Sequence, residues 1–237
     1  LLTVNSCKES DSIFKDNETQ EPVTRSGESG WDYPVKPGTE EWASFTTGEQ
    51  MLKACQIPQS ILETLSTKEL AEICMNYPLF FEYIFIDDER EGINIMIENF
   101  NGLKELSKRP DGVLELVNVY KNYPVLTQIQ DETSKDYDTP YKLPFLELLL
   151  ANDIFISQLD TQITTELGKI VLEKYERKLE NAHVYSMYNI KKTFLLGAVV
   201  LSKQKPGQQD IVKRFIDNYN NLDENLLTEI SKIMSEL

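Results

Sequence analysis

Apolar residues recur at intervals of three and four along the chain from about residue 47 onward, and this helical periodicity constrains the fold most strongly. One face of the segment 160–180 carries Ile163, Leu167, Ile170 and Val171. The segment 186–203 contains Thr193–Leu201, which is apolar on all sides and typical of a buried central helix. No stretch shows the alternation of period two that is typical of a β-strand. We therefore predict a single all-α domain over residues 47–237.

Capping residues and prolines predict where individual helices begin. Ser66-Thr-Lys-Glu69 is a capping box, in which the two side chains accept hydrogen bonds from backbone N–H groups at the helix start. Proline also favours a helix start, because its φ angle is already helical and it has no N–H group to satisfy. Acidic residues are favourable at this end because they face the positive end of the helix dipole. We expect helices to begin at or near Thr47, Pro58, Ser66, Pro78, Asp88 and Asp111.

One internal similarity concerns the overall architecture. Glu69–Pro78 matches Glu115–Pro124 at a shift of 46 residues, and each copy reads as a helix that ends in Asn-Tyr-Pro. A repeat of this length falls in the range of the helical pairs of HEAT and armadillo proteins. The sequence contains no third copy, so two alternatives stay open. The domain is either a short array of this kind or a set of helical hairpins that end alike by chance.

Two segments interrupt the helical pattern. Residues 31–46 contain both tryptophans and two prolines, and we expect an extended aromatic strap whose rings dock onto the folded domain. The alternative is a strap that binds a carbohydrate or a peptide. Residues 127–142 are polar, and we expect them to form an acidic loop that divides the domain into two helical halves.

The first seven residues resemble the end of a bacterial lipoprotein signal peptide. In Leu1-Leu-Thr-Val4-Asn-Ser6-Cys7, Val4 and Ser6 occupy the positions three and one before the cysteine that such a signal lipidates. Residues 1–7 are thus expected to be a signal-peptide remnant ending in Cys7, the lipidation site, whose acyl chains would anchor the protein in a membrane. The alternative is an incidental cysteine.

The residues after Cys7 are consistent with an anchor. Lys8-Glu-Ser-Asp11 resembles the acidic export signal of surface-exposed lipoproteins in some Gram-negative commensals. Residues 8–30 contain only three apolar side chains, Ile13, Phe14 and Val23. So few apolar groups cannot offset the entropy of ordering the segment, so we expect a flexible acidic tether.

Charge excludes several classes of partner. The chain has 24 basic and 39 acidic residues, a net charge of −15 and a pI near 4.6. Such a polyanion is repelled by nucleic-acid phosphates and by anionic lipid surfaces. The expected membrane contact is therefore the acylated Cys7 and not an electrostatic one.

Few residues are available for familiar catalytic chemistry. The chain has one histidine, His183, in the expected connection between two long helices, and we interpret it as a surface or helix-end residue. The signatures GxGxxG, GxxxxGK[ST], GxSxG and CxxC are absent from the sequence. We expect no catalytic residue that the sequence can identify, and no cofactor.

Cys55 and Cys74 allow two interpretations. In an exported protein they could form a disulfide, whose loop of about 20 residues would stabilise the fold by about 3 kcal/mol. The alternative is a pair of buried free thiols, since free cysteine is among the most buried residue types.

Acidic residues suggest two further hypotheses. Asp131, Glu132, Asp136 and Asp138 are a weak calcium candidate, because calcium prefers several carboxylate oxygens, but their spacing does not fit an EF-hand. We therefore expect a solvated acidic loop and no metal site. Paired carboxylates could also hydrolyse sugars, and a deep cleft with two of them about 5–10 Å apart would indicate this.

The stretch 33–124 also resembles a known family. Tyr33-Pro-Val-Lys-Pro-Gly, Cys55-Gln-Ile-Pro, Asn76-Tyr-Pro-Leu and Phe100-Asn-Gly are similar to motifs in a family of uncharacterised secreted proteins of Gram-negative gut bacteria. The family has no assigned activity, so the resemblance implies an envelope location and no site residue.

These observations together predict a non-enzymatic binding module, lipid-anchored to the outer membrane and facing the surface or the periplasm, with an unidentified protein or glycan partner. The first alternative is a small carboxylate-dependent hydrolase of envelope or dietary polymers. The second is a structural envelope lipoprotein. An exposed apolar patch would favour the binding module.

Overall fold

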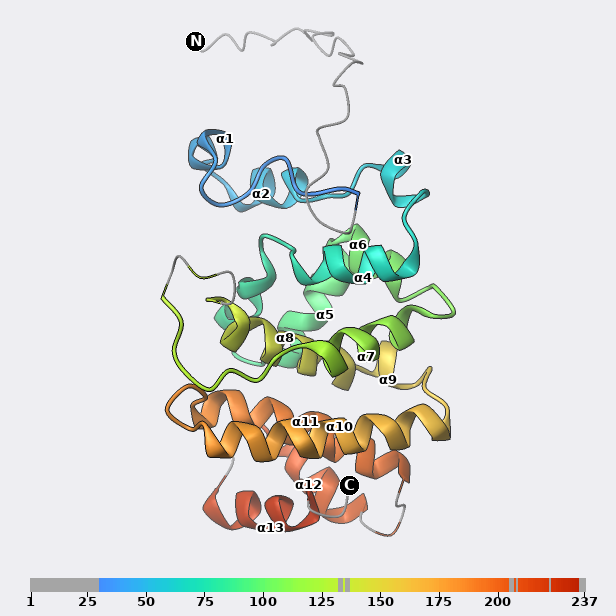
Figure 1. Ribbon diagram of the computed structural model, residues 1–237, viewed down its shortest axis with the longest axis vertical. Helices are drawn as coiled ribbons and strands as arrows, with labels where there is room; N and C mark the ends of the chain where they lie inside the picture. Colours follow the sequence, from blue (N-terminus) through green and yellow to red (C-terminus); the bar gives the residue numbers. More distant parts are fainter. Residues whose placement is uncertain are drawn as a thin grey trace, which may run out of the picture.

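The computed structural model describes residues 30–131, 134, 137–204, 207, 209–221 and 223–234. Within these ranges the chain forms thirteen α-helices and one 3-10 helix, η1, and no β-strand (Figure 1). The prediction of an all-α fold is confirmed. The predicted lipidation site, Cys7, and residues 8–29 of the predicted tether lie outside the described residues.

The helices fall into two groups along the chain. Those before the loop near residue 130 are α1 (Glu40–Ser44), α2 (Gly48–Ala54), α3 (Gln59–Leu62), α4 (Thr67–Met75), η1 (Phe80–Phe85), α5 (Glu89–Asn99), α6 (Asn101–Leu106) and α7 (Gly112–Asn122). Those after it are α8 (Thr139–Ala151), α9 (Asp153–Ile156), α10 (Thr161–Glu180), α11 (Met187–Gln204), α12 (Gln209–Asp217) and α13 (Glu224–Met234).

The predicted helix starts agree with the structure at most positions. Ser66 Oγ accepts a hydrogen bond from Glu69 N at 3.2 Å, and Glu69 Oε2 accepts one from Ser66 N at 2.9 Å, which completes the capping box of α4. Thr47 and Gln50 form a second capping box at α2. The segment after Pro78 differs from expectation, because it is the 3-10 helix η1 and ends in extended backbone at Ile86.

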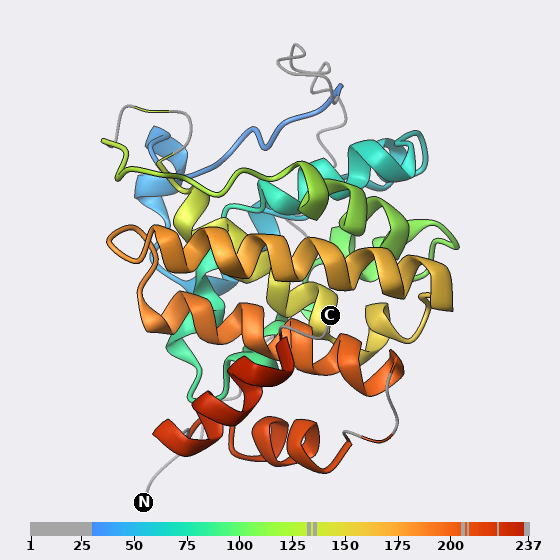
Figure 2. The same cartoon turned by 60° about the horizontal axis from the view of Figure 1, so that its bottom comes forward.

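The central helices stack in two layers. In one layer α4 packs on α7 and α7 on α10, and in the other α5 packs on α8 and α8 on α11. The chain alternates between the layers (Figures 1 and 2). As a result, α7 forms a hairpin with α8, and α10 forms one with α11. The short helix α6 packs against both α4 and α5. In Figure 1, α1–α3 lie above this stack and α12 and α13 below it.

The stack contains a third helical pair, α10 with α11, that the sequence similarity did not reveal. The third pair lacks the Asn-Tyr-Pro ending, because α10 ends at Glu180 and continues as Asn181-Ala-His. Hydrogen bonds join successive pairs at the turns that lead into α4, α7 and α10. Thr67 Oγ1 donates to Asp111 Oδ1 at 2.8 Å, and Gln158 Nε2 donates to Ser107 O at 3.0 Å. The fold is therefore a short array of helical hairpins.

The aromatic strap lies against the first helices. Tyr33 is buried, its ring lies 6.4 Å from those of Tyr77 and Phe100, and its hydroxyl donates to Ile73 O at 3.3 Å. Trp31 and Trp42 are partly buried against the same core. The strap is not extended throughout, because Thr39 caps the short helix α1.

The acidic loop is shorter than residues 127–142, because α8 begins at Thr139. Pro140 lies in the first turn of α8, where its fixed φ angle favours the helix. Asp138 immediately precedes the helix and pairs with Lys142 at 2.7 Å.

Candidate functional site

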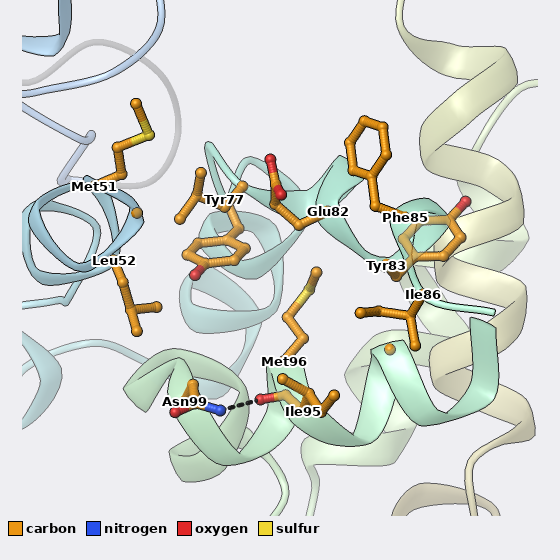
Figure 3. A pocket seen from close by; sticks show the side chains of 13 residues that line it. Met51, Leu52, Tyr77, Glu82, Tyr83, Phe85, Ile86, Ile95, Met96 and Asn99 are labelled. Carbon is orange, nitrogen blue, oxygen red and sulfur yellow. Dashed lines mark hydrogen bonds between the residues drawn. The ribbon is translucent and has the colours of Figure 1, made fainter. Parts of the chain in front are cut away.

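An apolar pocket of about 430 Å³ opens between α2, η1 and α5 (Figure 3). Met51 and Leu52 of α2 face it from one side, and the side chains of η1 and α5 face it from the other. Its described lining residues are Gly48, Met51, Leu52, Tyr77, Leu79, Glu82, Tyr83, Phe85, Ile86, Gly92, Ile95, Met96 and Asn99. A concave, mostly apolar site with few polar groups is the usual form of a ligand-binding site.

A glycine allows the close approach that forms the far wall. A Cβ at Gly92 would lie 2.8 Å from Tyr83 O and 2.9 Å from Tyr83 Cα. No side chain fits at that distance, so Gly92 is needed for α5 to pack directly on η1. Tyr77, which also lines the pocket, stacks on Phe100 with ring centroids 4.1 Å apart.

The mouth of the pocket exposes large apolar side chains. Phe85 is 72% exposed, Ile95 41% and Ile86 38%. Isolated exposed apolar residues are common, but three that gather around one hollow form a patch of the kind that marks interaction sites. This is the exposed apolar patch that the sequence analysis named as the sign of a binding module.

The carboxylate of Glu89 lies on the other side of the 84–86 segment, beside a second hollow of about 260 Å³. It pairs with the buried Lys192 at 2.8 Å and accepts hydrogen bonds from the hydroxyls of Tyr188 and Tyr219. Burial lowers the pKa of Lys192 to about 8, against the opposing effect of Glu89. These contacts hold α5 to α11 and to Tyr219, which follows α12, so they also fix the segment that carries Phe85 and Ile86.

Asp88 fixes the same segment from the start of α5. Its Oδ1 accepts hydrogen bonds from Arg90 N at 3.0 Å and from Arg90 Nε at 2.9 Å, and Arg90 Nη1 donates to Ile216 O at 2.8 Å. The hydrogen bonds from Arg90 lower the pKa of Asp88 to about 2. The expected helix cap at Asp88 is therefore confirmed, and Arg90, which binds Asp88, also contacts α12.

A buried polar cluster joins the two layers of the array. Lys178 Nζ donates to both carboxylate oxygens of Glu147 at 2.8 Å, while Thr193 Oγ1 and Tyr120 OH donate to Glu147 Oε1 at 2.9 and 3.0 Å. Burial lowers the pKa of Lys178, and the nearby Glu147 acts in the opposite direction. Both side chains are fully buried and lie away from the pockets described above, so the cluster is structural.

In the structure Cys55 and Cys74 are a pair of buried free thiols, which is the second of the two interpretations. Both are free thiols, both are buried, and no disulfide joins them. Burial raises the pKa of the Cys55 thiol to about 12 and raises that of Cys74 as well. Neither is a reactive thiolate near neutral pH.

The remaining candidates do not come together. His183 is exposed, and its Nε2 lies 3.0 Å from Thr127 O. Of the calcium candidates, Glu132 and Asp136 lie outside the described residues, and Asp138 pairs with Lys142. The described residues contain no group of three or more side chains placed to hold a metal ion.

The geometry of the pocket also bears on the hydrolase alternative. Glu82 is the single carboxylate among the described residues that line the larger pocket. In the smaller hollow Asp87 accompanies Glu89, but Glu89 is already bound to a lysine and two tyrosines. Two carboxylates free to act on opposite sides of a bond are not found in either hollow.

None of the described helices combines the length and the apolar composition that a bilayer crossing requires. No protein-family model, curated protein or solved structure matches this chain.

Proposed function

We propose that this chain is a lipid-anchored bacterial binding protein, facing the cell surface or the periplasm, that holds an apolar part of its ligand in the pocket between α2, η1 and α5. The observation that carries the proposal is the pocket itself, an open apolar hollow of about 430 Å³ with Phe85, Ile86 and Ile95 exposed at its mouth. Burying these side chains against a ligand would contribute roughly 25 cal/mol for each Å² of apolar surface removed from water.

The pocket can be tested with the neutral apolar dye Nile red, whose fluorescence rises in apolar surroundings. The variant Gly48→Phe introduces a ring at the pocket wall, where a new Cβ meets no atom within 4 Å. We expect this variant to bind the dye at least about tenfold more weakly than the unmodified chain, a loss of about 1.4 kcal/mol.

Gly48→Ala is the matched control, because it changes the same position and leaves the hollow open. We expect it to bind Nile red as the unmodified chain does. Equal dye binding by the Phe and Ala variants, both folded by circular dichroism, would show that the pocket is not the binding site.

The proposed anchor is tested by mass spectrometry of the protein isolated from its native membrane fraction. A fragment that begins at Cys7 and carries two or three acyl chains is the expected result, because stable anchoring needs more than one chain. An unmodified peptide that continues through Cys7 would refute the anchor and leave the pocket proposal unaffected.

A further inference from the structure

We infer that the ligand is a cationic amphipathic segment of another protein, with a large apolar side chain that enters the pocket and lysine or arginine side chains that contact its rim. This inference rests on the proposed function and names the class of partner. It is carried by the charges on the three elements that form the pocket, which are mostly negative.

Four exposed glutamates form the rim. Glu82 lines the pocket, and Glu49 follows the lining residue Gly48 in the first turn of α2. Glu91 and Glu98 lie four residues before and three residues after Ile95 on α5, so they flank it on the same helix face. None of the four forms an ion pair with another residue in the described part of the chain.

Basic residues on the same elements are fewer than the four glutamates of this rim. The sequences of α2, η1 and α5 contain only two, Lys53 and Arg90. Arg90 is turned to Asp88 and to Ile216 O, and so it is occupied away from the pocket. The patch therefore combines an apolar centre with a negative border, which selects a partner with an apolar centre and a positive border.

The same charges disfavour other occupants. A second copy of the chain carries its own net charge of −15, so two copies repel one another. The chain's first 30 residues contain three basic residues (Lys8, Lys15 and Arg25) and six acidic ones, so this segment is also negative overall. An anionic lipid surface is repelled for the same reason.

The dimensions of the site favour a polypeptide. The hollow of about 430 Å³ accommodates one or two large side chains, and the exposed Phe85 and Ile95 extend the apolar surface beyond it. An amphipathic helix presents its apolar side chains at i, i+3, i+4 and i+7 and its charges on either side of them, which matches this arrangement. Apolar side chains seated in such pockets supply most of the affinity in helix–groove complexes.

The inference is tested with two fluorescein-labelled helical peptides of about 14 residues. Both carry Leu and Phe at i, i+3, i+4 and i+7, and the flanking positions are Lys in one peptide and Glu in the other. In fluorescence anisotropy with the full chain we expect the Lys peptide to bind at least about tenfold more tightly than the Glu peptide. Its affinity should fall as salt screens the rim.

Variants show whether the rim glutamates are responsible for the binding of the Lys peptide. The triple variant Glu49→Gln, Glu91→Gln and Glu98→Gln, which changes none of the residues that line the pocket, should weaken binding of the Lys peptide about tenfold and should leave Nile red binding unchanged. The matched control removes three exposed carboxylates elsewhere, through Glu63→Gln, Glu176→Gln and Glu180→Gln, and should bind the Lys peptide as the unmodified chain does.

Two results would overturn the inference. Equal weakening by both triple variants would mean that the peptide responds to net charge alone. Equal or tighter binding of the Glu peptide, or of a peptide with residues 8–30 of this chain, would mean that the occupant is not a cationic partner. The proposed function is judged separately, by the dye. If Gly48→Phe abolishes Nile red binding, the proposed function stands. If Gly48→Phe leaves Nile red binding intact, the proposed function fails.

Discussion

The carboxylate of Glu147 shows how much a single residue can contribute to holding the array together. It sits on α8, in the otherwise apolar run Leu146-Glu-Leu-Leu-Leu150, and is fully buried. A buried charge costs several kcal/mol unless it is paired and hydrogen-bonded, and Lys178, Thr193 and Tyr120 supply those partners from three other helices. The cluster therefore ties α8 to α7, α10 and α11 at one point.

Removing the lysine of this cluster should destabilise the protein strongly. We expect Lys178→Met to lower the free energy of unfolding by about 3–5 kcal/mol, because it leaves Glu147 charged and buried without a counterion. The double variant Lys178→Met, Glu147→Leu should recover most of that loss, since no charge remains buried. Urea unfolding at pH 7, followed by circular dichroism, measures both.

Lys121→Met is the matched control for this substitution. Lys121 pairs with Glu166 at 2.7 Å, but both side chains are about half exposed, so its loss should cost less than about 1 kcal/mol. A Lys178→Met variant no less stable than Lys121→Met would contradict the account of the cluster.

Sequence alone could not place this cluster. Glu147 and Lys178 are typical surface residues by composition, and each can be recognised as buried only when the helices around it are in place. Glu147 interrupts an apolar helix, and that interruption was the one available signal. Its partners lie 27 to 46 residues away along the chain, so no local pattern connects them.

At the scale of the helix, the local sequence was sufficient to predict where a helix begins if a capping side chain was present. Thr47, Ser66 and Asp88 each cap a helix in the structure as their sequence context predicts. The helices that were missed, α1 and α9, contain five and four residues, too few to display an apolar periodicity. The segment Phe80–Phe85 is a 3-10 helix, and α5 packs directly on it at Gly92, a tertiary contact that local sequence does not reveal.

The pairing of the helices was predictable only in part. The similarity between Glu69–Pro78 and Glu115–Pro124 does correspond to two packed helices, α4 and α7. The third helix of that layer, α10, has 20 residues and a different ending, so sequence comparison within the chain did not identify it. Layer packing depends on which faces are apolar and not on the residues at helix ends, so the array extends further than the similarity does.

At the scale of the molecule, the pocket arises from three segments that the sequence analysis treated separately. Nothing in the spacing of Met51, Phe85 and Ile95 along the sequence indicates that they surround a hollow. Phe85 and Ile86 remain exposed because η1 ends there and the chain turns into α5, held by Asp88 and Glu89. The candidate site is therefore a product of the tertiary structure.

Methionine residues provide a direct readout of this site. The chain has five, at positions 51, 75, 96, 187 and 234, and Met51 and Met96 line the pocket. Met187 lies instead at a separate hollow between α10, α11 and α13, and Met234 is buried in α13. A sample with 13C-labelled methionine methyl groups therefore gives five signals, which single substitutions to leucine can assign.

The central claim, that the pocket between α2, η1 and α5 binds the ligand, is tested most directly by titrating this labelled protein with Nile red and then with the lysine-rich peptide. We predict that the methyl signals of Met51 and Met96 shift with each added aliquot and saturate, while those of Met187 and Met234 do not move. Saturating shifts at Met187 or Met234, with Met51 and Met96 unchanged, would contradict the account.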